Sequence, residues 1–350
     1  MRNIQVLGKF FDQPMLVSKF KKAVPALLVA GASAYTMYDA SKEKDVEKRK
    51  QRALKTGITL GVTVASALAA PYIASAVTKR PLNPSLKNIK LKNAELVDSF
   101  VKSSNLDEKT ASILQKSKEK VLSFGEIKSV FKNLKDKNGG KQFLEKLIPS
   151  PENISAKDIF SEIGFLSVNG AIPVVGGITG GILADRFTDK EYWKDKVSDK
   201  IKEGSYQYLA NIFLCNVGAG LALAGLEKFG VNSKIGRAVG MTAGIIAMGV
   251  VGGSKIANFI GEKVIEPLCH KKDKTHTHST NVLDIKLQEH IKSNHKPHKH
   301  SKRKPELLDI GLHVDDVATV SLLSGLKWIE PALPVMYTIS GYRAGIGYRN

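Results

Sequence analysis

Histidines are the residues of this sequence best suited to metal chemistry, and they are concentrated in one polar stretch. Seven of the eight histidines lie between positions 270 and 300. Imidazoles at this density bind zinc, nickel or copper loosely, whereas a structural zinc site needs four fixed ligands, and the neighbouring lysines repel a cation. The stretch is therefore either a weak divalent-metal site or a solvated basic loop, and no resident cofactor is expected. The candidate ligands are His276, His278, His295, His298 and His300.

A second set of chemically suggestive residues lies in the last apolar block, residues 317–342. Lys327 and Glu330 are three positions apart, so they would share one face of a helix and could pair. Charged groups at membrane depth are costly and mark a pathway or binding site, and Pro331 and Pro334 would break the helix, as transporters do at their sites. The charge-free pieces on either side have only 10 and 12 residues, too few to span a bilayer alone. The block is either a candidate pathway or a re-entrant, interfacial segment.

Signatures of the common enzyme classes are missing from the sequence. It contains no Walker loop, no G-x-S-x-G, no H-E-x-x-H and no C-x-x-C. The run G-G-I-T-G-G at 176–181 lacks the lysine of a phosphate loop. The two cysteines, Cys215 and Cys269, are expected to be free thiols. The sequence therefore predicts a non-catalytic protein.

Long apolar stretches must position any such residues. A helix of about 20 apolar residues crosses a hydrocarbon layer, and together with the last block the stretches predict about six transmembrane helices in an all-α, polytopic chain. The first stretch could instead be the core of a secretory signal, because Ala32-Ser33-Ala34 resembles a cleavage site. The stretches are 23–38, 56–78, 163–184, 204–226 and 236–261.

Glycines four residues apart recur in these stretches. Small residues at this spacing let helix backbones approach closely, which drives association inside a bilayer. The contacts could join helices of one chain or build a homo-oligomer. The predicted helix-packing positions are Gly57, Gly61, Gly176, Gly177, Gly180, Gly181, Gly236, Gly240, Gly244, Gly249 and Gly253.

The net charge of +20 predicts an anionic partner. Basic residues occur in nearly every polar segment rather than on one aromatic platform, which favours membrane lipids with anionic headgroups over nucleic acid. Residues 79–157 contain no apolar run long enough to span, and the capping-box pattern from Ser123 to Glu126 indicates three or four amphipathic helices. This insert is either a solvated face or a docking module for a protein partner or for headgroups.

These features divide the chain into six parts. We expect a membrane protein that scaffolds, anchors or shapes a bilayer; the alternative is a channel or secondary transporter, with a metal cation as one candidate substrate. A bacterial cytoplasmic membrane is the default location, because no organelle address is visible. The parts are a basic amphipathic segment (1–22), a transmembrane hairpin (23–78), the lysine-rich insert (79–157), three glycine-rich transmembrane helices (158–261), a His/Lys-rich loop (262–316) and the proline-broken end (317–350).

Overall fold

The computed structural model describes residues 3–82, 85–135, 137–148, 156–231, 234–270 and 330–347. Every regular element in these ranges is a helix, which confirms the predicted all-α class. Four helices in these ranges are long and apolar enough to cross a membrane: Val46–Thr78, Phe160–Thr188, Val197–Lys228 and Val239–Cys269. The expected total of six transmembrane helices stays a prediction.

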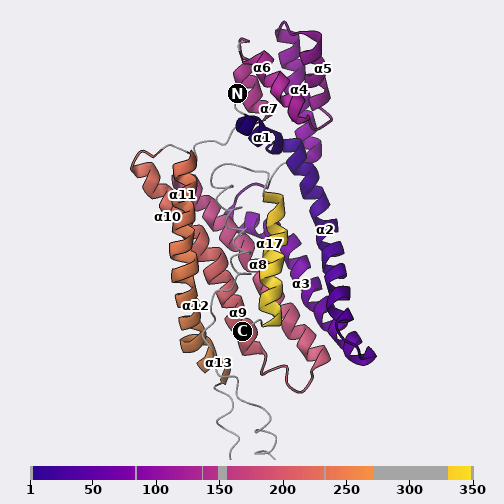
Figure 1. Ribbon diagram of the computed structural model, residues 1–350, viewed down its shortest axis with the longest axis vertical. Coiled ribbons are helices and arrows are strands. Elements are labelled where there is room, and N and C mark those ends of the chain that lie inside the picture. Colours follow the sequence, from indigo (N-terminus) through magenta and orange to yellow (C-terminus); the bar gives the residue numbers. More distant parts are fainter. Residues whose placement is uncertain are drawn as a thin grey trace, which may run out of the picture.

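The long helices form one bundle (Figure 1). Helix α3 packs against α8, and both contact α17; α9 lies against α8 and α17, while α2 packs along α3. A continuous helix of α9, η1 and α10 is followed by a second one of α11, η2, α12, η3 and α13. The bounds are α2 Pro14–Ser41, α3 Val46–Thr78, α8 Ala156–Thr188, α9 Val197–Tyr208, η1 Leu209–Phe213, α10 Leu214–Lys228, α11 Lys234–Ile245, η2 Ile246–Gly253, α12 Ser254–Ile260, η3 Gly261–Ile265, α13 Glu266–His270 and α17 Leu333–Ile346.

Glycines of α8 set the closest helix contacts in the bundle. A Cβ atom at Gly177 or Gly181 would overlap the backbone oxygens of Gly341 and Gly345 on α17. A Cβ atom at Gly176 would overlap the Ser66 side chain of α3, and Gly180 lies on the same helix beside Val62 and Thr59. Two neighbouring glycine rows therefore let α8 touch two helices of the same chain at once.

The other predicted glycine positions divide into two groups. Gly244 meets Gly218 between α11 and α10, and Gly249 and Gly253 lie against Cys215 and Ala210; Gly240 meets Leu226, and Gly236 lies on α11. The two glycines of α3 make no tight contact within the chain. Gly57 makes only an ordinary contact with Thr36, and a Cβ at Gly61 would have no neighbour within 4 Å. Gly61 lies on the exposed side because α8 and α17 pack against the threonine face of α3 instead.

The insert forms a helical module with its own hydrophobic core. We use "module" for α1 (Asn3–Phe11), α4 (Leu86–Ser103), α5 (Glu108–Ser117), α6 (Phe124–Leu134) and α7 (Gly140–Leu147), which lie together at one end of the bundle (Figure 1). Val6 of α1 is completely buried in this core. The N-terminal segment is thus part of the module, and a break between Phe11 and Pro14 separates α1 from α2.

Hydrogen bonds connect the N-terminal segment to the rest of the module and join the module to α2. The Gln13 side chain accepts from the Leu122 backbone N–H (2.8 Å) and donates to its carbonyl (2.9 Å). The ammonium of Lys9 donates to the Ile148 carbonyl at 2.6 Å. The capping box predicted at Ser123 and Glu126 is confirmed, with both hydrogen bonds present.

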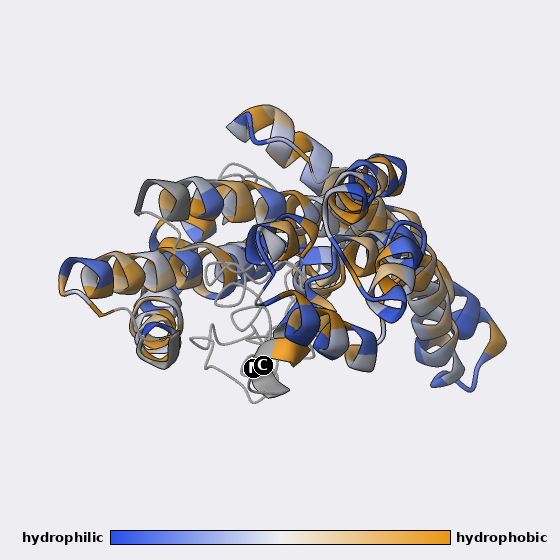
Figure 2. Cartoon of the chain, turned by 90° about the horizontal axis from the view of Figure 1, so that it is seen from above, coloured by the Kyte–Doolittle hydropathy of each residue, from blue (hydrophilic) through white to orange (hydrophobic). Residues whose placement is uncertain are grey.

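Large apolar side chains face outward along the bundle helices. Figure 2 shows hydrophobic residues on the outer surfaces of several helices. Val175 and Phe187 on α8 are about 60% exposed (61% and 62%), and exposed apolar residues recur on α3 and from η2 to α13. Helices that face lipid tails need such an outer surface, because the tails offer no partner to polar groups.

The glycine contacts predict a pair of opposite mutational effects. Gly177→Ala should lower the free energy of unfolding by about 1–3 kcal/mol, because the new methyl group forces α8 and α17 apart. Gly61→Ala introduces the same methyl group at an open position of a helix and should be neutral or stabilising by up to about 1 kcal/mol. Thermal unfolding of both variants in detergent measures the difference. Equal shifts would contradict the packing described here.

Candidate functional site

A buried ionic cluster lies at the end of the bundle opposite the module. Asp185 of α8 has no exposed surface. Its two carboxylate oxygens lie 2.6 Å from Lys55 Nζ of α3 and 2.9 Å from Lys200 Nζ of α9. Lys200, itself buried, also donates to the carbonyl oxygen of Gly345 on α17. The carboxylate therefore joins three helices, and Lys200 connects them to a fourth, α17.

The sequence positions of these groups explain why they meet. Lys55 directly precedes the charge-free run 56–78, and Asp185 directly follows the run 163–184. Since α3 and α8 are antiparallel, the start of one run and the end of the other lie at the same level. Lys200 reaches this level from the first turn of α9.

Sequence reasoning missed this cluster because it placed the start of the fourth span at Gly204. The helix begins at Val197 instead, so Lys200, Lys202 and Glu203 belong to its buried face rather than to a charged connector. The available signal was the recurrence of polar residues every four positions from Glu203 onward.

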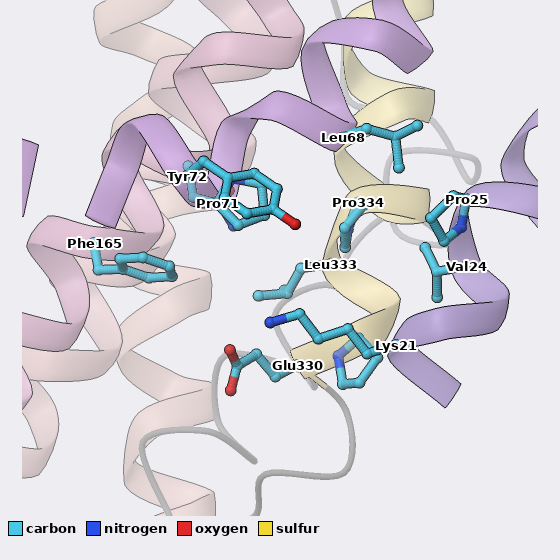
Figure 3. A pocket seen from close by; sticks show the side chains of 12 residues that line it. Lys21, Val24, Pro25, Leu68, Pro71, Tyr72, Phe165, Glu330, Leu333 and Pro334 are labelled. Atoms are coloured by element: carbon cyan, nitrogen blue, oxygen red, sulfur yellow. The ribbon is translucent and has the colours of Figure 1, made fainter. Parts of the chain in front are cut away.

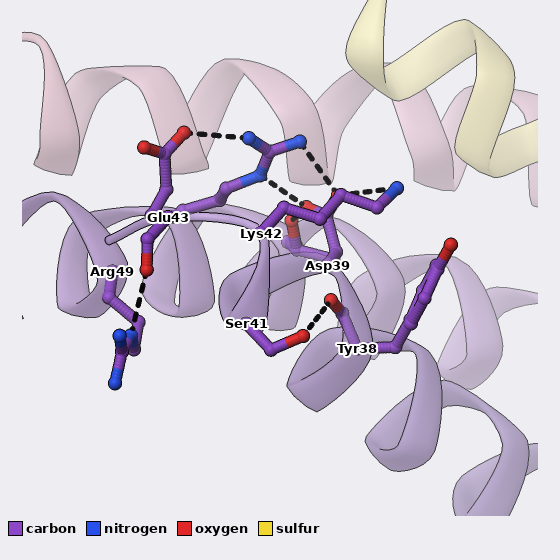
Figure 4. Close-up of polar contacts among 8 residues, drawn as sticks. Tyr38, Asp39, Ser41, Lys42, Glu43 and Arg49 are labelled. Carbon is purple, nitrogen blue, oxygen red and sulfur yellow. Dashed lines mark hydrogen bonds and ion pairs between the residues drawn. The ribbon is translucent and has the colours of Figure 1, made fainter. Parts of the chain in front are cut away.

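The same level of the bundle carries further ion pairs. Arg52 of α3 donates from Nε and Nη2 to both carboxylate oxygens of Asp39 (3.0 and 2.9 Å) and from Nη1 to Glu43 (2.7 Å). Figure 4 shows Asp39 in the last turn of α2 and Glu43 in the turn that follows it. Lys202 of α9 lies 3.3 Å from Glu266 of α13. We call this set the charged layer: Asp39, Glu43, Arg52, Lys55, Asp185, Lys200, Lys202 and Glu266.

Arg52 also lowers the pKa of Asp39. The hydrogen bonds from Arg52 hold the pKa of Asp39 below its ordinary value, although burial acts in the opposite direction, and the Thr56 hydroxyl adds a third hydrogen bond. Asp39 therefore remains a carboxylate at neutral pH, as an ion-paired layer requires.

A polar ladder extends from the charged layer into the bundle along α9 and η1. Gln207 Nε2 donates to Glu203 Oε1 at 2.8 Å, and Asn211 Nδ2 donates to Gln207 Oε1 at 3.0 Å. All three side chains are buried. Both bonds join residues four apart on one continuous helix, where they satisfy buried polar groups. A continuous polar line is also what a proton or cation path would need.

The opposite end of the α3–α8 pair is also closed by an ion pair. Arg80, just after α3, lies 2.6 Å from Glu162 of α8. Its guanidinium group is 4.7 Å from the ring centre of Phe165. The antiparallel pair is therefore held by opposite charges at both ends, with apolar helix between them.

Only some of the remaining predicted site residues lie within the described ranges. Glu330 is in the short 3-10 helix η5 (Glu330–Ala332), and Pro334 is in the first turn of α17, where proline is tolerated. Glu330, Pro331 and Pro334 line a cavity of about 90 Å³. Lys327 and the histidines at 276, 278, 295, 298 and 300 lie outside the described residues.

Comparison with known proteins supplies no relative. No family model matches the chain, and no curated protein or solved structure is significantly similar to it. Among the described residues, no group of three or more His, Cys, Asp or Glu side chains could hold a metal ion. The arrangement of charges, helices and module is therefore the basis for a functional proposal.

The buried cluster predicts a position-specific cost of removing charge. Asp185→Asn leaves the buried ammonium of Lys200 without its carboxylate and should cost about 3–5 kcal/mol of stability. Asp189→Asn is the matched control, because Asp189 pairs with Lys196 in the exposed connector, where an ion pair contributes at most about 1 kcal/mol. Unfolding in detergent compares the two. A loss at Asp185 no larger than at Asp189 would show that the cluster does not hold the bundle.

Proposed function

We propose that this chain is a non-catalytic multi-pass membrane protein whose helical bundle anchors a lysine-rich module at a membrane surface. The observation that carries the proposal is the separate core of the module, placed at one end of a bundle whose outer surface is apolar. The glycine contacts described above occur within one chain, so the bundle does not need a second copy to fill them.

The number of membrane crossings is part of the same proposal. Helices α2 and α17 lie alongside the long apolar helices, and α17 is the shorter of the two (Figure 1). With 16 charge-free residues in 23–38, α2 is a short crossing. Helix α17 has 14 residues, too few to span a bilayer alone. We propose α2 as a fifth crossing and α17 as a sixth, proline-broken and re-entrant segment, in a bacterial cytoplasmic membrane.

The charge of the module identifies the surface it would face. Between positions 85 and 148 the sequence has 14 lysines and 8 acidic residues. Lys128, Lys132 and Lys135 are spaced i, i+4 and i+7, so they share one exposed face at α6, while Ile127 and Phe131 of the same helix are buried in the module core. A lysine near an anionic membrane surface contributes about 1 kcal/mol to binding. Anionic headgroups therefore fit this face.

The proposal predicts how binding depends on these three lysines. The protein is held in nanodiscs of neutral lipid, and its binding to vesicles with anionic headgroups is measured by flotation. Replacing Lys128, Lys132 and Lys135 with glutamine should weaken binding roughly a hundredfold, since three contributions of about 1 kcal/mol are lost. Higher salt should weaken wild-type binding as well.

The matched control carries the same change at the other end of the bundle. Lys44, Lys48 and Lys50 are exposed at the α2–α3 turn, and their replacement with glutamine removes equal charge. Binding should persist in this control. Equal losses in both triple variants, or equal binding to neutral vesicles, would contradict a role for the module face.

A second candidate function, cation or proton transport, is favoured by the polar ladder that continues from the charged layer. It predicts flux into proteoliposomes that Glu203→Gln abolishes, whereas Glu262→Gln, a change outside the ladder, preserves it. Flux that is the same in the Glu203 variant and in wild type would remove the ladder from any transport path.

A further inference from the structure

The cavity beside Glu330 lies near the module end of the bundle. Its walls come from α2, α3, α8 and the start of α17, and its apolar part includes Val24, Leu68, Phe165 and Leu333. Lys21 and Lys22 immediately precede the apolar run of α2, and Glu162 immediately precedes that of α8. In the proposed membrane the cavity therefore lies at the boundary between hydrocarbon and headgroups.

Opposite charges face each other in this cavity. The Lys21 side chain enters from α2 and the Glu330 side chain from η5, before α17, and Figure 3 shows the ammonium and the carboxylate reaching to the same side of the cavity. Asn169 of α8 also lines the cavity and is only 2% exposed. Among the described residues, no donor reaches its Oδ1 atom. A buried amide oxygen without a donor is costly, so a ligand that donates would be favoured here.

We propose that this cavity binds the headgroup of a phospholipid with a primary ammonium, the phosphatidylethanolamine class. The ammonium would donate to the Glu330 carboxylate and to Asn169 Oδ1, and the phosphate would face the Lys21 ammonium. A zwitterion matches the opposite charges of Lys21 and Glu330, and its N–H donors match the Glu330 carboxylate and the Asn169 amide oxygen. A cavity of about 90 Å³ suits a primary ammonium better than the larger choline group, which has no N–H to donate.

A methylation series of lipids tests the proposal on the unmodified protein. Full-length protein in detergent is titrated with phosphatidylethanolamine, its N-methyl and N,N-dimethyl derivatives, phosphatidylcholine and phosphatidylglycerol, and binding is followed by native mass spectrometry. Affinity should fall with each N–H removed, by about tenfold or more between the first and the fully methylated lipid, since hydrogen bonds to charged groups are lost. Equal affinity across the series, or tighter binding of phosphatidylglycerol, would overturn the proposal.

Variants and a soluble headgroup complete the test. Glu330→Gln should reduce the preference for the ethanolamine lipid over the choline lipid to nearly one, whereas Glu47→Gln, an exposed pair partner of Lys50, should leave it unchanged. A preference that survives in the Glu330 variant would overturn the assignment. Soluble phosphoethanolamine should bind at least tenfold more weakly than the lipid, and equal binding would exclude a lipid as the occupant. None of these outcomes depends on the lysines of α6.

Discussion

The buried carboxylate of Asp185 is the constraint on which the arrangement of the bundle depends. A charge without exposed surface is stable only when it is paired, and here two lysines from two other helices pair with it. This requirement fixes α3, α8 and α9 at a common level, and Lys200 extends the tie to α17 through Gly345. The neighbouring ion pairs of the charged layer add α2 and α13.

A second ion pair, between Arg80 and Glu162, lies at the other end of the antiparallel pair α3 and α8. The two ion-paired levels therefore mark two boundaries, with apolar helix between them. Lys55 and Arg80 are 25 positions apart, and Glu162 and Asp185 are 23 apart; at 1.5 Å per residue these separations correspond to about 38 Å and about 35 Å. Both are close to the thickness of a bilayer's hydrocarbon core, about 30 Å. Between the two boundaries the helices meet through glycines, which bring backbones together where apolar side chains gain nothing over lipid. The module lies beyond one boundary and the charged layer at the other.

Much of this fold follows from local sequence patterns, but the site does not. Charge-free runs and the capping box at Ser123 are local signals, so the helices and the module could be predicted. Packing through Gly61 stays a prediction, because within the chain α8 meets a different side of α3, and only tertiary structure decides which side that is. Asp185 and Lys200 looked like ends of a polar connector, since their burial depends on helices far away in the sequence. The pairing of Lys9 and Gln13 with the module is equally non-local.

The central claim is that the bundle crosses a membrane with the module on one side and the charged layer on the other. Single cysteines at Ser103, Phe229, Ser41 and Lys190, in a background without Cys215 and Cys269, test it directly with an impermeant thiol reagent on intact and lysed vesicles. If the bundle crosses in this way, cysteines at Ser103 and Phe229 react from one side, and cysteines at Ser41 and Lys190 react only from the other. Reaction of all four positions from the same side would contradict it.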